Sequence, residues 1–109
     1  MTYQLTEYAS AIADSNGLAI ARTGPRRAFE RWHITGATVS STSSALEPRC
    51  DVYRGGIGPA FKIGGTFSGR SDSGPADDWV DSGQDIIAVW TGADVGAQCS
   101  LTLSGESQR

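Results

Sequence analysis

The sequence is poor in charge, histidine and cysteine, and each shortage argues against a class of function. Charged residues make up 19% of the 109 residues, and the nine basic ones are scattered along the chain. Binding to a phosphate backbone requires clustered lysine and arginine, so nucleic acid is not an expected partner. One histidine and two cysteines are too few for the usual zinc ligand sets, so no metal and no other cofactor is expected.

Long apolar runs and a leader segment are also missing. No run approaches the roughly 20 apolar residues of a membrane-spanning helix, and the first residues do not resemble a signal peptide. The sequence therefore predicts a protein that starts in the cytosol and has no membrane partner.

The two cysteines, Cys50 and Cys99, each alternate with apolar residues, which predicts that both point inward from a strand. A disulfide between them would close a long loop and add about 3–4 kcal/mol of stability in the chain-entropy model. Two buried free thiols are the alternative. The missing secretion signal favours free thiols.

Glycine, serine and threonine are abundant instead, and they separate short stretches that have the pattern of strands. Residues 97–104 alternate strictly between apolar and polar side chains, which predicts a strand with one face in a core. Residues 86–90 are apolar throughout, which predicts a strand that is central in its sheet or masked by a partner chain. Residues 91–96 predict a hairpin loop between these two strands.

Further strands are predicted at the spacing typical of a sandwich. Asn16-Gly17 is a strong hairpin signal between two short apolar stretches, because both central positions of a type I′ turn need a positive φ. Residues 29–41 predict a long strand in which the apolar parity shifts near Gly36. A β-bulge at Gly36 explains this shift, and so does a strand that passes from one sheet to another.

Residues 49–54 and 65–69 predict two shorter strands, whereas the glycine-rich stretch 55–65 and the acidic stretch 71–84 are expected to be mostly irregular. The count is about seven strands, with no substantial helix. This pattern predicts an all-β fold, a single antiparallel β-sandwich of jelly-roll or immunoglobulin-like type, over residues 11–107.

No pattern in the sequence predicts catalysis. His33 lies on the outward side of its predicted strand and is expected to be a plain surface residue. Five aspartates between residues 72 and 85 lack the spacing and the closing glutamate of a calcium-binding loop, so solvated turns are expected there. The sequence therefore predicts a protein that is not an enzyme, without catalytic, cofactor-binding or metal-binding residues.

Binding surfaces remain, and large aromatic and apolar side chains are the candidate anchors. Residues 1–10 are predicted to be an N-terminal arm that orders on docking. The alternative for each candidate anchor is a place in the core of this domain. The candidate interface residues are Tyr3, Leu5, Tyr8, Phe61 and Trp79.

Four stretches carry a resemblance to a known group of proteins: NGLAIARTGPRRAFERWHI (16–34), PRCDVYRG (48–55), GGTFSG (64–69) and SGQDIIAVWTGADVGAQCSLTLSGE (82–106). They are similar to small β-sandwich virion proteins of tailed bacteriophages that infect actinobacteria. VWTGADVGA is the most specific part. The resemblance implies a structural protein of the particle and no catalytic residues.

The resulting hypothesis is a phage virion structural protein, foremost a capsid decoration protein that reinforces or coats the shell after assembly in the host cytoplasm. Its expected partners are the major capsid protein or other virion proteins, and further copies of the chain in a homo-oligomer. One alternative is a neck or tail component, such as a head–tail connector or minor tail protein. The other is a carbohydrate-binding module for host attachment that uses Trp79 and Tyr53 as stacking platforms.

Overall fold

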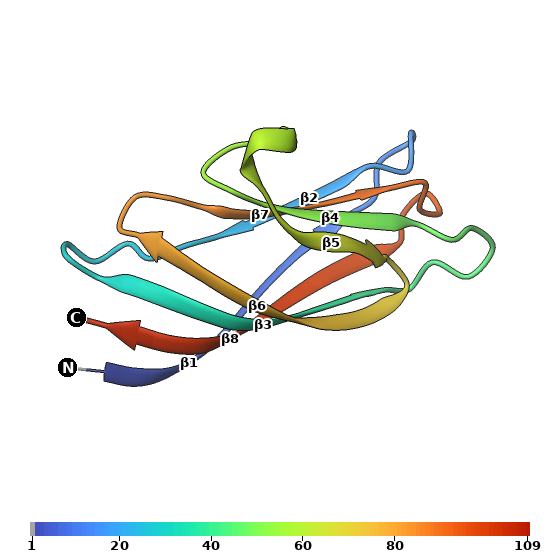
Figure 1. The fold of residues 1–109 in the computed structure, drawn as a ribbon. Helices are drawn as coiled ribbons and strands as arrows, with labels where there is room; N and C mark the ends of the chain where they lie inside the picture. The colour runs from blue at the N-terminus through green and yellow to red at the C-terminus, as the bar shows by residue number, and fades with distance from the viewer. Residues whose placement is uncertain (1) are drawn as a thin grey trace.

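The computed structural model describes residues 2–109, which form eight strands and one three-residue 3₁₀ helix (Figure 1). The strands are β1 (Thr2–Ile12), β2 (Ala19–Thr23), β3 (Arg31–Ser41), β4 (Arg49–Arg54), β5 (Lys62–Ser68), β6 (Ser71–Asp81), β7 (Ile86–Thr91) and β8 (Gln98–Gln108), and the helix η1 spans Pro59–Phe61. The predicted all-β fold is confirmed, with eight strands instead of about seven. None of the described residues forms a helix long and apolar enough to span a bilayer.

The strands form two four-stranded antiparallel sheets that pack face to face (Figure 1). Sheet A has the order β1-β8-β3-β6, and sheet B has the order β2-β7-β4-β5. Only β4 and β5 are neighbours in both the sequence and a sheet, and every other connection crosses between the sheets. This strand order is that of a jelly roll, one of the two sandwich types that the sequence predicts.

Two turns that were predicted to close hairpins connect the two sheets instead. Gly17 has a φ of 75°, and its N–H donates to the carbonyl oxygen of Asp14 at 3.0 Å, so the first turn forms where the sequence places it. The strands on either side, β1 and β2, nevertheless belong to different sheets. The loop 91–96 likewise joins β7 of sheet B to β8 of sheet A. Alternation shows which face of a strand is buried, but both sheets bury a face in the same core.

The segment 1–10, which was predicted to be an arm, and the segment 71–84, which was predicted to be mostly irregular, provide the two edge strands of sheet A. β1 pairs with β8 from Thr2 to Ile12 without a register shift, so the predicted arm is an integral strand; Met1 lies outside the described residues. β6 pairs with β3 although it contains Gly74 and Pro75. An edge strand tolerates proline because one side of its backbone needs no partner.

The parity shift in β3 is a β-bulge, one of the two explanations that the sequence allows. The register of β3 with both β6 and β8 shifts between Ile34 and Gly36. Trp32 and Val39, on either side of the bulge, consequently both reach the core. Because β3 stays in sheet A along its whole length, the alternative of a strand that changes sheets is wrong.

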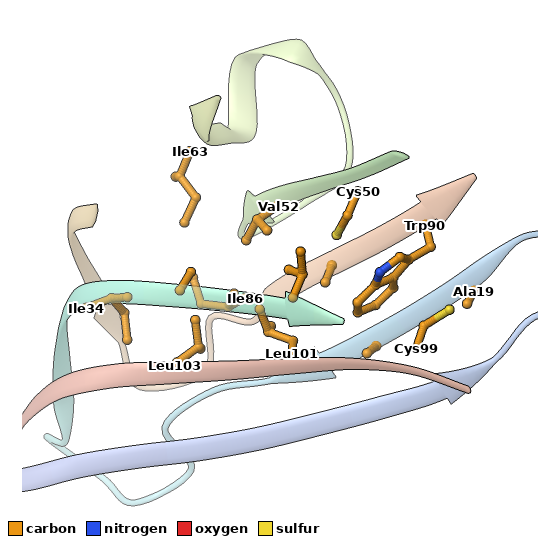
Figure 2. Close-up of a cluster of buried hydrophobic side chains, with 14 of the residues drawn as sticks. Ala19, Ile34, Cys50, Val52, Ile63, Ile86, Trp90, Cys99, Leu101 and Leu103 are labelled. Atoms are coloured by element: carbon orange, nitrogen blue, oxygen red, sulfur yellow. The ribbon is translucent and has the colours of Figure 1, made fainter. Parts of the chain in front are cut away.

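The core lies between the two sheets, and β7 supplies much of it (Figure 2). β7 is central in sheet B, between β2 and β4, as its apolar run predicts. Trp90 at its end is completely buried and lies near Cys50 and Cys99 in Figure 2. Both cysteines are buried free thiols, and burial raises the pKa of Cys50 to about 12. The structure therefore agrees with the prediction, favoured by the sequence, that the two cysteines are free thiols.

Two buried carboxylates have structural partners. Glu30 is 6% exposed and accepts hydrogen bonds from Ser107 Oγ at 2.7 Å and Arg109 Nε at 3.2 Å. The Ser107 hydrogen bond lowers the pKa of Glu30 and outweighs the opposing effect of burial. At Asp51 burial raises the pKa, but hydrogen bonds from Thr66 and Lys62 and the positive charges of Lys62 and Arg49 together outweigh it, so this pKa is lowered as well. Both groups stabilise the fold when they are ionised.

We expect the free energy of unfolding to decrease as the pH drops below about 4.5. The ordinary pKa values of Glu30 and Asp51 are 4.5 and 3.8, and both are lower in the folded state. Their stabilisation is therefore complete above the ordinary values and is lost as the pH falls through the folded-state values. Urea denaturation at pH 7 and pH 3 measures the difference. Glu30→Gln should reduce this difference in stability, and the change at the exposed Glu106, Glu106→Gln, should reduce it less. Equal stability of the wild type at both pH values would contradict the stabilising role of Glu30 and Asp51.

Candidate functional site

A cluster of polar and aromatic side chains lies on the outer face of sheet A, where β3 runs beside β6. Trp32 and Val80 pair on the inner face of the same two strands and are buried. The residues that flank them in the sequence therefore point outward. We call this group the Trp79 cluster, and its members are Arg31, His33, Asp77, Trp79 and Asp81.

The members of the Trp79 cluster are in close contact. His33 and Trp79 lie opposite each other in the β3–β6 register, and their rings stack with centroids 4.4 Å apart and planes 5° from parallel. Asp77 Oδ1 lies 2.6 Å from His33 Nε2. Arg31 donates from Nε to Asp81 Oδ1 at 2.8 Å, and its Cζ lies 4.7 Å from the centroid of the Trp79 ring. These contacts hold the indole ring in one orientation.

The Trp79 cluster is better suited to recognition than to stabilising the fold. The side chains of Arg31, Asp77 and Asp81 are 51%, 88% and 62% exposed. Ion pairs this exposed contribute no more than about 1 kcal/mol each. Tryptophan and arginine are, however, among the residue types enriched at the energetic centres of protein interfaces.

The same cluster lacks the parts of a nucleophilic catalytic site. Asp77 contacts His33 as a carboxylate orients a catalytic histidine. The cross-strand neighbours of His33 among the described residues are Trp79 on β6 and Glu106 on β8, and neither carries a hydroxyl or thiol. The arrangement therefore offers an aromatic and charged contact surface.

Leu5, one of the predicted interface residues, belongs to the core. It is 5% exposed and lies on the inner side of β1, opposite Gly105 of β8. The prediction that Leu5 is an interface anchor is wrong, because the segment that carries it is a paired strand whose odd positions face inward.

The other four predicted interface residues are at least partly exposed but lie in different places. Tyr8 is 57% exposed on the outer face of sheet A, with its hydroxyl 2.9 Å from Ser100 Oγ. Tyr3 is 43% exposed and lies under the guanidinium of Arg109, 4.6 Å from the ring centroid. Phe61 is 48% exposed in η1, between β4 and β5. The fourth, Trp79, lies in the Trp79 cluster.

Trp79 and Tyr53 do not form a common stacking platform. Val52 and Val80 face the core, so Tyr53 points outward from sheet B whereas Trp79 points outward from sheet A. In addition, His33 covers one face of the indole ring. The two aromatics proposed for sugar stacking thus lie on opposite sides of the sandwich.

A pocket of about 510 Å³ opens where the β4–β5 connection approaches β6 and the turn that follows it. Phe61 contributes an aromatic ring to its lining. The polar lining residues are Arg54, Lys62, Asp78 and Gln84. Arg54 donates to the carbonyl oxygen of Trp79 at 2.9 Å and lies 3.8 Å from Asp78. Lys62 Nζ lies 3.1 Å from Asp51. The charged residues that line this pocket are therefore paired within the fold.

The five aspartates of the acidic stretch do not converge on one point. Four of them lie within β6 and the fifth follows the turn after it, and each contacts a different partner. The pairs are Asp72 with the N–H groups of Ser68 and Ser73, Asp77 with His33, Asp78 with Arg54, Asp81 with Arg31, and Asp85 with Arg26. Within the part of the chain that the structure describes, no three potential metal ligands come together.

No family model and no curated protein sequence matches the chain. Solved structures match its fold. The Yersinia pseudotuberculosis-derived mitogen is 14% identical and aligns over 94% of this chain and 87% of its own, with a TM-score of 0.50. A chain of the infectious bursal disease virus Gx strain is 12% identical, over 98% of this chain and 30% of its own, with a TM-score of 0.41.

The β-(1,4)-mannanase GH26-CBM35 of Podospora anserina is also 12% identical, over 96% of this chain and 27% of its own, with a TM-score of 0.47. The chain thus spans less than a third of the viral and mannanase chains. At these identities the likeness extends to the fold alone.

Sequence reasoning found Trp79 but missed the residues that surround it. Arg31 and His33 share one parity in β3, and Asp77 and Asp81 share that of Trp79 in β6. Shared parity was the available signal. This signal could not be used because the acidic stretch was not predicted to be a strand, so no face of a sheet could be assigned to Trp79.

Proposed function

We propose that the chain is a structural protein of a tailed-phage virion, a capsid decoration protein that docks on the shell through the outer face of sheet A. The observation that carries this proposal is the Trp79 cluster, an oriented indole ring with Arg31 beside it on an exposed sheet face. The sequence resemblance to phage virion proteins supports the choice of a phage particle.

The ionisable groups support a structural role. A general acid or base works best with a pKa near the working pH. Glu30 and Asp51 have pKa values lowered below the ordinary range for carboxylates, and each contacts hydrogen-bond donors from other parts of the fold. Burial raises the pKa of both cysteines and keeps them in the unreactive thiol form. These groups hold the sandwich together.

Docking on phage particles tests the proposal. Purified protein is added to particles that lack it, and the bound fraction is measured by sedimentation and quantitative mass spectrometry. Trp79→Ala and Arg31→Ala should each weaken binding by about 30-fold or more, as expected for anchor residues. Tyr53→Ala, on the opposite face, is the matched control and should bind like the wild type.

The same measurement separates the alternatives. A copy number in fixed proportion to the major capsid protein supports decoration of the shell, whereas a small number confined to one vertex supports a neck or tail position. A protein that never sediments with the particles contradicts the virion proposal. Binding to a glycan array that disappears in Trp79→Ala would favour the host-attachment module instead.

A further inference from the structure

The two sheets end in four edge strands, β1 and β6 in sheet A and β2 and β5 in sheet B. An edge strand exposes unpaired backbone N–H and C=O groups, which pair with any available strand unless something prevents it. Charged residues, proline, bulges and short length are the usual means of prevention. A comparison of the four edges therefore shows where another chain can add.

Three of the four edges carry such protection. β6 contains Pro75, a register shift opposite Ile34 and Gly36, and four aspartates. β5 has a register shift against β4 and includes Lys62 and Gly65. β2 is only five residues long and includes an arginine.

β1 has the fewest of these features. It is eleven residues long, pairs with β8 without a register shift, and contains no proline, glycine, lysine or arginine. Its single charged residue is Glu7. Among the described strands β1 pairs with β8 alone, at the outer edge of its sheet (Figure 1). It is therefore a long, regular edge on which Glu7 is the one residue that opposes strand addition.

We propose that β1 pairs antiparallel with β1 of a second copy, which joins two A sheets into one eight-stranded sheet across a twofold axis. The second copy is favoured because the other edges that it offers are poor partners. β6 would bring its aspartates toward Glu7 and a proline that cannot donate, β5 is irregular and β2 is short. A symmetric contact also closes on itself and gives a dimer instead of a fibre. This inference does not depend on the proposed virion role.

The sequence of β1 selects the register of the pair. A twofold axis through Glu7 would place two like charges directly opposite each other, which is unfavourable. An axis through Thr6 sets Glu7 opposite Leu5 and pairs two threonines, so it brings no aromatic side chains together. An axis through Tyr8 pairs the two tyrosines on the outer face, where Tyr8 is 57% exposed, and sets Glu7 opposite Ala9. Aromatic cross-strand pairs are favourable, so the axis passes through Tyr8.

Charge exchange at position 8 tests both the edge and the register. Analytical ultracentrifugation over a range of concentrations should show a dimer for the wild type and for Tyr8→Phe. Tyr8→Lys and Tyr8→Glu should each raise the dissociation constant at least about tenfold, because each places like charges on the axis. Mixing these two variants should restore a dimer. Tyr53→Lys, on the opposite sheet, should dimerise like the wild type, and circular dichroism shows that every variant is folded.

Disulfide trapping provides an independent measurement. Residues directly opposite in a strand pair have Cβ atoms within reach of a disulfide. Tyr8→Cys should therefore form a covalent dimer on oxidation, whereas Thr6→Cys should do so only when mixed with Ser10→Cys. The native thiols are buried and do not interfere.

Several outcomes would overturn the inference. A wild type that stays monomeric in all conditions rules out pairing with a second copy. The same conclusion follows if β1 pairs only with a strand of a different protein. A Tyr8→Lys variant that still dimerises rules out the β1 edge. Two charged variants that do not recombine, or trapping at position 6 alone, rule out the register. Because no particle is present, failure here leaves the docking test of Trp79 unaffected.

Discussion

Gly105→Ala is expected to lower the free energy of unfolding by about 3 kcal/mol or more, although it adds a single methyl group. Gly105 lies in β8 opposite Ile34 of the central strand β3. Its φ is 155°, a backbone conformation that residues other than glycine rarely adopt. A Cβ at this position would overlap the carbonyl oxygen of His33. That oxygen belongs to the backbone of β3, so relief requires the two strands to separate.

Gly65→Ala is the matched control for this prediction. Gly65 also lies in a strand, but it is exposed at the edge of sheet B, and a Cβ there has no atom within 4 Å. Alanine restricts the unfolded chain more than glycine, so this change should leave the stability unchanged or raise it slightly. Urea denaturation followed by tryptophan fluorescence compares the two variants. Equal stabilities would mean that β3 and β8 are not packed as closely as described.

Trp90→Ala is the substitution with the second large effect, an expected loss of about 3–5 kcal/mol. The side chain of Trp90 is completely buried between the sheets, and a Cβ added at Gly69 would lie only 3.0 Å from its ring. With the backbone packed this closely, the space left by the indole cannot be refilled. Domains of this size are stable by about 5–15 kcal/mol in total, so much of the margin disappears. Thermal denaturation should show a midpoint lowered by roughly 15–30 °C.

Two further variants show whether this loss comes from the core. Trp90→Phe keeps a ring and removes the indole N–H, which has no hydrogen-bond partner among the described residues, so its loss should be much smaller. Trp79→Ala removes a tryptophan from the outer face of sheet A and should change stability by about 1 kcal/mol or less. A Trp79→Ala protein as unstable as Trp90→Ala would mean that the Trp79 cluster is part of the core.

The faces of individual strands were predictable from the sequence, because alternation reports burial directly. The alternation of residues 97–104 gave the inward face of β8 correctly. The parity shift near Gly36 located the irregularity of β3 but left open whether it was a bulge or a change of sheet. The failures concern segments with few apolar residues. In β1 only Leu5 is a large aliphatic residue at an inward position, and in β6 only Val80 is fully buried. Edge strands cover less of the core and therefore carry a weaker pattern.

Strand pairing was not predictable in the same way. Turn sequences such as Asn16-Gly17 specify a local reversal of the chain, but the partner of each strand is set by contacts between distant parts of the sequence. The candidate site depends on one such pairing. The parity of His33 predicts its outward direction correctly, yet its ring stacks on Trp79 only because β3 pairs with β6. His33 and Trp79 are 46 positions apart in the sequence, so no local motif predicts the site that they form.

The pairing of Thr2 with Gln108 places the two ends of the described chain side by side (Figure 1). A linker of a few residues would therefore connect them without crossing the sandwich. New termini opened in the exposed stretch 44–47 or at the β7–β8 connection would then yield a circular permutant with the same strand order. For the same reason, peptides fused to either end would emerge from one spot on the surface, which suits paired display of two sequences.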